Sequence, residues 1–233
     1  MVIKAIFYDL DGTLRMNEPH SWSVFTDFAS TLGFNITKQD VFRIARWEHS
    51  YFANSYELIQ DRNKYLDGSE FWTNYGYRQL IELGASRVRA AELAPTIFQH
   101  MNDAYHPTDV IPEDLVETLK LLKQKGVMLG VLSNRSESYS DYLIEKGLGD
   151  YFSLAIFAAE TGTFKPDPAI FHYLLEKAGV PAAESFYVGD NYYADVVGSR
   201  GAGMNPVLLD VEGLFDHPDC PVIQKHHQIF DLL

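Results

Sequence analysis

Cysteine and basic residues are scarce in this sequence, and long apolar runs are missing. The single cysteine, Cys220, cannot form a disulfide within the chain, and the sequence contains no Cys-x-x-Cys pair. No apolar stretch approaches the roughly 20 residues of a membrane-spanning helix, so we expect no membrane partner. Nineteen Lys and Arg against 32 Asp and Glu give a net charge of −13. This charge disfavours nucleic acid as a partner, because phosphates attract basic surfaces.

The composition does provide the material for a folded core. Of the 233 residues, 46% are hydrophobic and 14% are aromatic, which suffices for one large domain or two small ones. The N-terminal stretch "MVIKAIFYDL" lacks the small-residue cleavage site of a secretory signal. We therefore expect a cytoplasmic protein that binds a small ligand or a cation.

The first residues and the C-terminal half follow the pattern of a parallel sheet covered by helices. Residues 2–8, "VIKAIFY", form a nearly continuous apolar run, as strands do when both faces are buried. From residue 113 onward helices and strands alternate, which is typical of βαβ units. The predicted strands are 127–133, 154–158, 185–189 and 205–210, and the predicted helices are 113–126, 138–149, 167–179 and 192–203. The predicted fold class is α/β, with a doubly wound, Rossmann-like parallel sheet. The last stretch, 211–233, is irregular in pattern.

Residues 16–107 have a different, helical pattern. Four segments without strand-like alternation indicate helices: 21–34, 37–60, 68–84 and 85–101. Thr37 with Asp40 resembles a capping box, and Pro107 with Pro112 predicts a stiff return of the chain. We therefore predict two domains, an α/β core from 1–15 and 108–233 and a smaller all-helical domain from 16–107.

Polar side chains follow the ends of several predicted strands. They are Asp9 and Asp11 in "YDLDGTL", Ser133 and Asn134, Lys165, and Asp190 with Asp195. Because the carboxyl ends of parallel strands share one edge of a sheet, we expect these residues to converge there. Carboxylates beside a hydroxyl, an amide and an ammonium suit a hard divalent cation together with a phosphate. Magnesium fits this donor set, whereas zinc would favour nitrogen or sulfur ligands.

The order of the motifs resembles a known family. "DLDGT", "LSN", "KPDP" and "VGDNYYAD", with a helical insert after the first, resemble the haloacid dehalogenase superfamily of phosphohydrolases. By that resemblance, Asp9 would be the nucleophile and Asp11 the general acid and base. The transferring phosphoryl group would be held by Thr13, Ser133, Lys165 and, through its backbone, Asn134.

The same resemblance implies a magnesium site and a mobile cap. Mg²⁺ would be bound by Asp9, the backbone carbonyl of Asp11 and Asp190, while Asn191 and Asp195 would support the metal shell. The helical domain at 16–107 would close over the substrate as a lid. The implied activity is magnesium-dependent hydrolysis of a small phosphorylated metabolite, a phosphate monoester, through an aspartyl-phosphate.

The chemistry of Asp11 leads to a separate expectation, and rival functions stay open. A general acid must be protonated near the working pH, and the negative charge of Asp9 is expected to raise the pKa of Asp11. A dehalogenase is disfavoured, because displacement of halide needs neither a proton donor nor a metal. A phosphomutase would use the same core residues and return the phosphoryl group to a second substrate position. A catalytically silent binding protein is the rival from another class.

Overall fold

The computed structural model describes residues 2–66 and 68–233; Met1 and Asp67, which fall in the predicted ranges 1–15 and 16–107, lie outside the described residues. The chain forms two compact units. The sheet unit comprises Met1–Met16 and Val110–Leu233, and the helical unit comprises Asn17–Asp109. The roles of these units as catalytic core and cap stay predictions.

The sheet unit is built on six parallel strands in the order β5-β4-β1-β6-β7-β8. These strands are β1 (Ala5–Tyr8), β4 (Met128–Ser133), β5 (Leu154–Phe157), β6 (Ser185–Gly189), β7 (Asn205–Leu209) and β8 (Val222–Ile223). In sequence order, β4 and β5 follow β1 on one side of it, and β6, β7 and β8 then follow on its other side. The α/β prediction is confirmed. Since strand order reverses beside β1, a ligand crevice is expected at the carboxyl ends of β1, β4 and β6.

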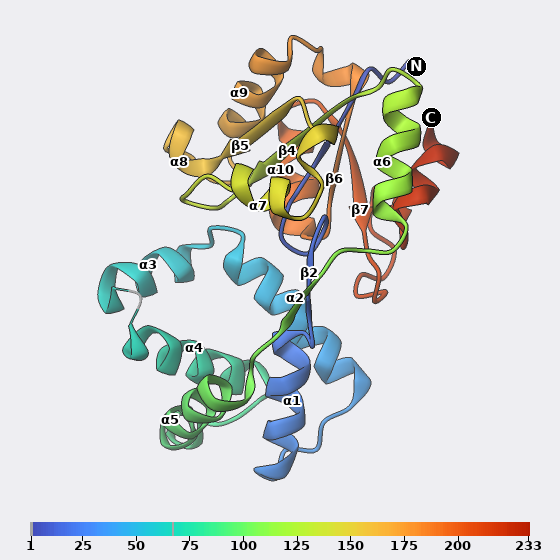
Figure 1. Ribbon diagram of the computed structural model, residues 1–233. Helices are drawn as coiled ribbons and strands as arrows, with labels where there is room; N and C mark the ends of the chain where they lie inside the picture. The colour runs from blue at the N-terminus through green and yellow to red at the C-terminus, as the bar shows by residue number, and fades with distance from the viewer. Residues whose placement is uncertain (1, 67) are drawn as a thin grey trace. The chain divides into compact units, whose positions relative to one another are not determined.

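Both faces of β1 are buried, which explains its continuous apolar sequence. Tyr8 packs in the core on one face, with helix α6 (Leu115–Gln124) and the C-terminal helix η4 (His226–Leu232). Phe7 packs in the core on the other face, with α9 (Pro168–Ala178). Figure 1 shows α6 and α9 on opposite sides of the sheet. The remaining short helices of this unit are α7 (Ser140–Glu145), η1 (Gly149–Tyr151), α8 (Ala158–Thr161), η2 (Ala182–Glu184), η3 (Tyr192–Val196) and α10 (Val197–Gly201).

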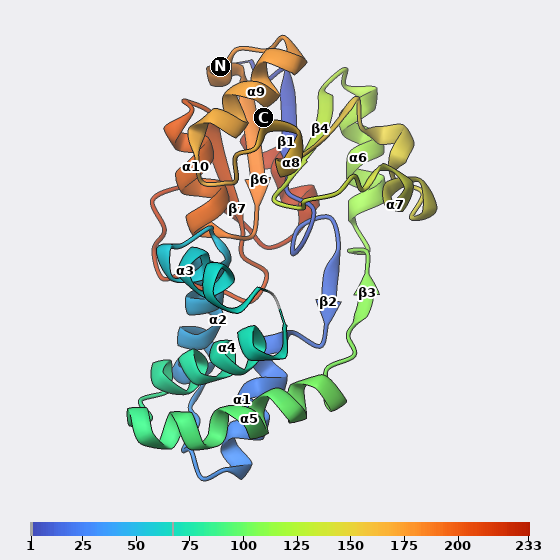
Figure 2. The same ribbon diagram turned by 90° about the vertical axis from the view of Figure 1, so that its left-hand side faces the viewer.

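The helical unit contains five helices in its described residues. They are α1 (Ser21–Thr31), α2 (Lys38–Phe52), α3 (Tyr56–Tyr65), α4 (Ser69–Glu82) and α5 (Arg87–Ala104). Figure 2 shows α4 lying along α5, and Leu80 and Ile97 bury this contact. The predicted capping box is confirmed, because Thr37 and Asp40 exchange side-chain and backbone hydrogen bonds at the start of α2.

Three features differ from the sequence-based pattern. The segment 37–60 is broken between α2 and α3, where Asn54 adopts a left-handed φ of 52° and Ser55 caps α3 by accepting from Leu58 N at 3.1 Å. A separate two-stranded sheet pairs β2 (Met16–Glu18) with β3 (Thr108–Val110). Strand β8 and helix η4 give structure to the stretch 211–233.

None of the helices in the described ranges combines the length and the apolar composition that a membrane span requires.

Candidate active site

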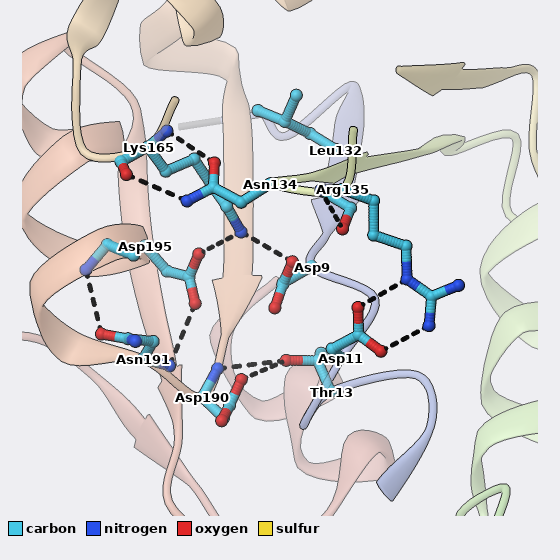
Figure 3. Close-up of polar contacts among 12 residues, drawn as sticks. Asp9, Asp11, Thr13, Leu132, Asn134, Arg135, Lys165, Asp190, Asn191 and Asp195 are labelled. Atoms are coloured by element: carbon cyan, nitrogen blue, oxygen red, sulfur yellow. Dashed lines mark hydrogen bonds and ion pairs between the residues drawn. The ribbon is translucent and has the colours of Figure 1, made fainter. Parts of the chain in front are cut away.

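Residues far apart in the sequence meet at the carboxyl ends of β1, β4 and β6. Figure 3 shows the ammonium of Lys165, from the loop before α9, between the carboxylates of Asp9 and Asp195. Lys165 Nζ donates to Asp9 Oδ1 at 2.6 Å and to Asp195 Oδ1 at 2.7 Å. Its third donor reaches the hydroxyl of Tyr187 at 3.2 Å. Lys165 is only 2% exposed, so its charge is compensated almost entirely by these neighbours.

Three carboxylates gather around this ammonium. One oxygen each from Asp9, Asp190 and Asp195 lie within 4.8 Å of one another. Thr13 fixes Asp190, because its hydroxyl donates to Asp190 Oδ1 at 3.2 Å and accepts from the Asp190 backbone N–H at 3.1 Å. Asp195, which the sequence predicted to support the metal shell, contributes its carboxylate to this cluster, and its role toward a metal stays a prediction. Three carboxylate oxygens in a largely buried site form a donor set that suits a hard divalent cation.

Two glycines make this close approach of carboxylates possible. Gly12 has a left-handed φ of +88°, and a Cβ at this position would overlap the carboxylate of Asp190. A Cβ at Gly189 would overlap the carboxylate of Asp195 in the same way. Glycine is therefore required at both positions to leave room for the acidic side chains.

The electrostatics of the cluster reflect an excess of negative charge. Burial raises the pKa of Asp9 to about 7; the attraction of Lys165 opposes this shift and the repulsion of Asp195 adds to it. Desolvation, followed by the charges of Asp9 and Asp195, raises the pKa of Asp190 well above its ordinary value. Burial lowers the pKa of Lys165, but Asp195 and Asp9 together raise it well above its usual value. A bound cation would relieve the repulsion among these carboxylates.

Asp11 lies in a different electrostatic environment. Figure 3 shows the Asp11 carboxylate facing Arg135. The guanidinium of Arg135 donates to it from Nε at 2.8 Å and from Nη2 at 2.7 Å. Arg15 donates to the same carboxylate at 2.7 Å. Burial is the largest single influence and acts to raise the pKa of Asp11, but Arg135 and Arg15 together outweigh it and lower the pKa. The expectation that Asp9 raises the pKa of Asp11 is therefore wrong, because two guanidinium groups dominate.

Asn134 holds the backbone of the lysine loop. Its Nδ2 donates to Lys165 O at 3.0 Å, and its Oδ1 accepts from Lys165 N at 2.7 Å. The side chain of Asn134 thus positions the backbone of Lys165, and the role implied for the Asn134 backbone stays a prediction. Ser133, at the end of β4, is buried, and its Oγ accepts from Arg135 N at 3.3 Å. The phosphate-binding roles of Thr13, Ser133, Asn134 and Lys165 stay predictions.

Asn191 supports the cluster through its backbone. Its N–H donates to Asp195 Oδ2 at 3.0 Å, while its side chain caps helix η3 by accepting from Tyr193 N and Ala194 N. Asp195 is thus held by Lys165 on one oxygen and by Asn191 on the other.

Sequence reasoning missed three residues of this site: Arg15, Arg135 and Tyr187. Arg135 directly follows the Ser133-Asn134 pair, and Arg15 lies four residues after Asp11. Their closeness in sequence to predicted site residues could have identified them. Tyr187 lies within β6, where an aromatic residue is ordinarily interpreted as core. Its hydroxyl donates to Leu132 O at 2.9 Å and receives the third donor of Lys165.

Comparisons with known proteins identify the family of this chain. Residues 3–203 match the sequence model of the haloacid dehalogenase-like hydrolases. The Danio rerio haloacid dehalogenase-like hydrolase domain-containing protein 3 is 38% identical, over 94% of this chain and 90% of that protein. A phosphoserine phosphatase of Thermus thermophilus is 28% identical, over 99% of this chain and 96% of the enzyme. The crystal structure of a 2-haloacid dehalogenase from Pseudomonas syringae covers 99% of this chain and 98% of its own, with a TM-score of 0.55 and 25% identity. This chain therefore belongs to the haloacid dehalogenase-like hydrolases.

Proposed function

We propose that this chain is a Mg²⁺-dependent phosphatase that hydrolyses a small organic phosphate monoester through an aspartyl-phosphate on Asp9. The proposal is carried by one observation: the carboxylates of Asp9, Asp190 and Asp195 gather within 4.8 Å, and the ammonium of Lys165 joins two of them. Relatives named as phosphatases support phosphoryl transfer. We also propose that the protein acts in the cytoplasm on a phosphorylated metabolite.

The donor set fits magnesium, and Asp9 and Asp190 would be its side-chain ligands, with the backbone carbonyl of Asp11 as the expected third. When bound, Mg²⁺ would neutralise the phosphoryl oxygens so that a carboxylate can approach phosphorus. Lys165 contributes a fixed positive charge for the same purpose and holds Asp9 Oδ1 in place. This leaves Asp9 Oδ2 as the candidate nucleophile.

The reaction divides into two displacements at phosphorus. In the first, Asp9 attacks phosphorus, the bond from phosphorus to the leaving oxygen breaks, and Asp11 gives its proton to the leaving alcohol. In the second, water attacks the aspartyl-phosphate, Asp11 accepts a proton from that water, and the Asp9 carboxylate and inorganic phosphate are released. Holding nucleophile and phosphate in line can remove about 7–11 kcal/mol from the barrier.

The pairing of Asp11 with two arginines adds a requirement to the first step. Arg135 and Arg15 favour the ionised carboxylate, which cannot donate a proton. Asp11 therefore has to leave this pair before it acts as an acid. We propose that phosphoryl oxygens of the bound substrate compete for the Arg135 guanidinium and release Asp11, since a guanidinium binds phosphate as well as carboxylate.

A phosphate-ester assay tests the proposal. We expect hydrolysis of p-nitrophenyl phosphate with Mg²⁺, its loss in EDTA, and a decrease of at least about 10³-fold in kcat for Asp9→Asn. Asp141→Asn, an exposed position in the same unit, is the matched control and is expected to keep full activity. Mass spectrometry of acid-quenched enzyme should locate a phosphoryl group on Asp9. Equal rates for Asp9→Asn and the unmodified protein would remove Asp9 from its role.

The same preparation separates the rival functions. Halide release from 2-chloropropionate without metal would identify a dehalogenase, the activity named for the Pseudomonas syringae structure. The proton donor and the three-carboxylate cluster have no use in that reaction, so we expect no halide release. Transfer of labelled phosphate to a second position of a sugar phosphate would identify a phosphomutase. Absence of turnover on every phosphate ester would favour the silent binding protein.

A further inference from the structure

The helical unit contains a cavity of about 450 Å³ that the proposed chemistry does not use. Small-molecule sites commonly have volumes of roughly 300–1,000 Å³, so this cavity is large enough for an organic ligand. Its lining is mainly aromatic and aliphatic, with contributions from α1, α2, α4 and α5. The principal apolar lining residues are Phe52, Trp72, Tyr75, Phe98, Met101 and Tyr105.

Part of this apolar lining is open to solvent. Trp72 is 46% exposed and Phe52 is 37% exposed, although both line the cavity. Large apolar side chains that stay exposed around a concavity are a feature of ligand-binding surfaces, since burying them against a ligand is favourable. Trp72 is thus accessible to a ligand that enters from solvent.

The buried carboxyl of Glu48 is hydrogen-bonded to two residues that line the cavity. Glu48, on α2, is 4% exposed, and it accepts from Ser21 Oγ at 2.7 Å and from Gln79 Nε2 at 2.8 Å. Ser21 and Gln79 both line the cavity. Burial raises the pKa of Glu48 to about 7, against the lowering effect of its polar neighbours Ser21, Tyr75 and Gln79. These bonds fix the hydroxyl and the amide that a ligand would meet.

The charge of this wall selects among ligands. Among the described residues that line the cavity, none is Lys, Arg or His. An anionic group would therefore enter an apolar site without a cation to compensate it and would lie near Glu48, which is unfavourable. A neutral or cationic donor would instead find the oxygens of Ser21 and Gln79, with Glu48 behind them.

We propose that this cavity binds a small molecule with an aromatic or aliphatic body and a neutral or cationic hydrogen-bond donor, an alcohol or an amine. The body packs against Trp72 and Phe52, and the donor reaches Ser21 and Gln79. The proposal does not depend on the phosphatase activity, because it rests on residues of the helical unit alone.

Three probes of one shape and different charge test the ligand class. The purified full chain is titrated by calorimetry with 2-phenylethylamine, 2-phenylethanol and phenylacetate. We expect the amine and the alcohol to bind at least about 10-fold more tightly than the carboxylate, a difference of about 1.4 kcal/mol. Three equal affinities, tighter binding of phenylacetate, or no heat of binding with any probe at millimolar concentration would overturn the proposal.

Variants locate the site. Trp72→Ala should weaken amine and alcohol binding about 10-fold or more, and because Trp72 is 46% exposed, the variant should keep its fold. Glu48→Gln should reduce the difference in affinity between 2-phenylethylamine and phenylacetate, while alcohol binding persists. Val88→Ala, at a 69% exposed position on α5 outside the cavity lining, is the control and should bind like the unmodified protein. Unchanged amine affinity in Trp72→Ala would place the ligand elsewhere and refute the proposal.

A competition experiment identifies the source of the ligand. If 2-phenylethylamine raises the KM for p-nitrophenyl phosphate without changing kcat, the site takes a part of the substrate. If binding leaves KM unchanged, the ligand is a separate molecule. Both results support the site, and the calorimetric titration of Asp9→Asn reports on binding even where the phosphatase proposal fails.

Discussion

Replacement of Lys165 by methionine is the sharpest test of the electrostatic balance in the site. The substitution keeps most of the side-chain volume and removes the positive charge that contacts both Asp9 and Asp195. When all three carboxylates are ionised, they sum with the ammonium of Lys165 to −2, and without it to −3. Removing one partner from a buried ion pair costs about 3–5 kcal/mol. In EDTA we therefore expect the melting temperature to fall by about 6–20 °C, at roughly 2–4 °C per kcal/mol.

Magnesium should offset this loss in a way that a packing defect would not show. Two unit charges 4 Å apart interact by about 1 kcal/mol even in water, so a divalent cation gains about 2 kcal/mol when the neighbouring ammonium is gone. Mg²⁺ should then bind Lys165→Met about 30-fold more tightly and stabilise it more than the unmodified protein.

Calorimetric unfolding in EDTA and at increasing MgCl₂ measures both effects. Lys120→Met is the matched control, since the Lys120 side chain is 53% exposed and its removal should change stability by less than about 1 kcal/mol. Tyr187→Phe removes the neutral partner of Lys165 and should cost about 1 kcal/mol with no change in magnesium affinity. The reasoning is refuted if Lys165→Met unfolds like the unmodified protein in EDTA, or if Mg²⁺ stabilises the two proteins equally.

Three further predictions concern other parts of the molecule. Folding raises the pKa of Glu48 from 4.5 to about 7, so protonation of Glu48 stabilises the protein below pH 4.5 and this contribution is lost as pH rises to 7. Between pH 4.5 and 7, the free energy of unfolding in denaturant should fall by up to about 3 kcal/mol relative to that of Glu48→Gln. Gly12→Ala places a methyl group on the Asp190 carboxylate, so it should reduce magnesium affinity, measured by calorimetry, and phosphatase activity by at least about 10-fold each. Unchanged affinity and activity would contradict the assigned geometry. Arg135→Met removes a group that lowers the pKa of Asp11, so the high-pH limb of kcat/KM should move to higher pH; an unshifted profile would separate Asp11 from proton donation.

Local chemistry made most of the fold predictable. The apolar run 2–8 and the alternation after residue 113 depend on burial of whole faces. Residues 5–8 of that run form β1, while Val2 is 77% exposed, and the alternation appears as the parallel sheet. The predicted helix at 167–179 begins with a local sequence signal, because Asp167 caps it by accepting from Ala169 N at 2.9 Å and Pro168 follows as its first residue. By contrast, strand β8 has only two residues, too few for any periodic pattern to emerge.

The positions of the candidate site residues followed from strand order, but their contacts did not. Lys165 and Asp190 could be placed near Asp9 because parallel strands end at one edge. The ion pair from Arg135 to Asp11 joins residues 124 positions apart, and its geometry depends on how the loop after β4 turns. Likewise, Asp195 enters the cluster because Gly189 lacks a side chain in its path, which spacing alone does not reveal.

The two acids of "YDLDGTL" show how one short segment supports opposite electrostatic environments. Side chains two positions apart along an extended strand share a face, and two carboxylates there would repel each other. Strand β1 ends at Tyr8, however, and the chain turns through the left-handed Gly12. Asp9 is therefore held by Lys165 in the carboxylate cluster, while Asp11 is held by Arg135 and Arg15. Burial raises the pKa of Asp9 against the attraction of Lys165, whereas two arginines outweigh burial and lower the pKa of Asp11, although only one residue lies between the two acids.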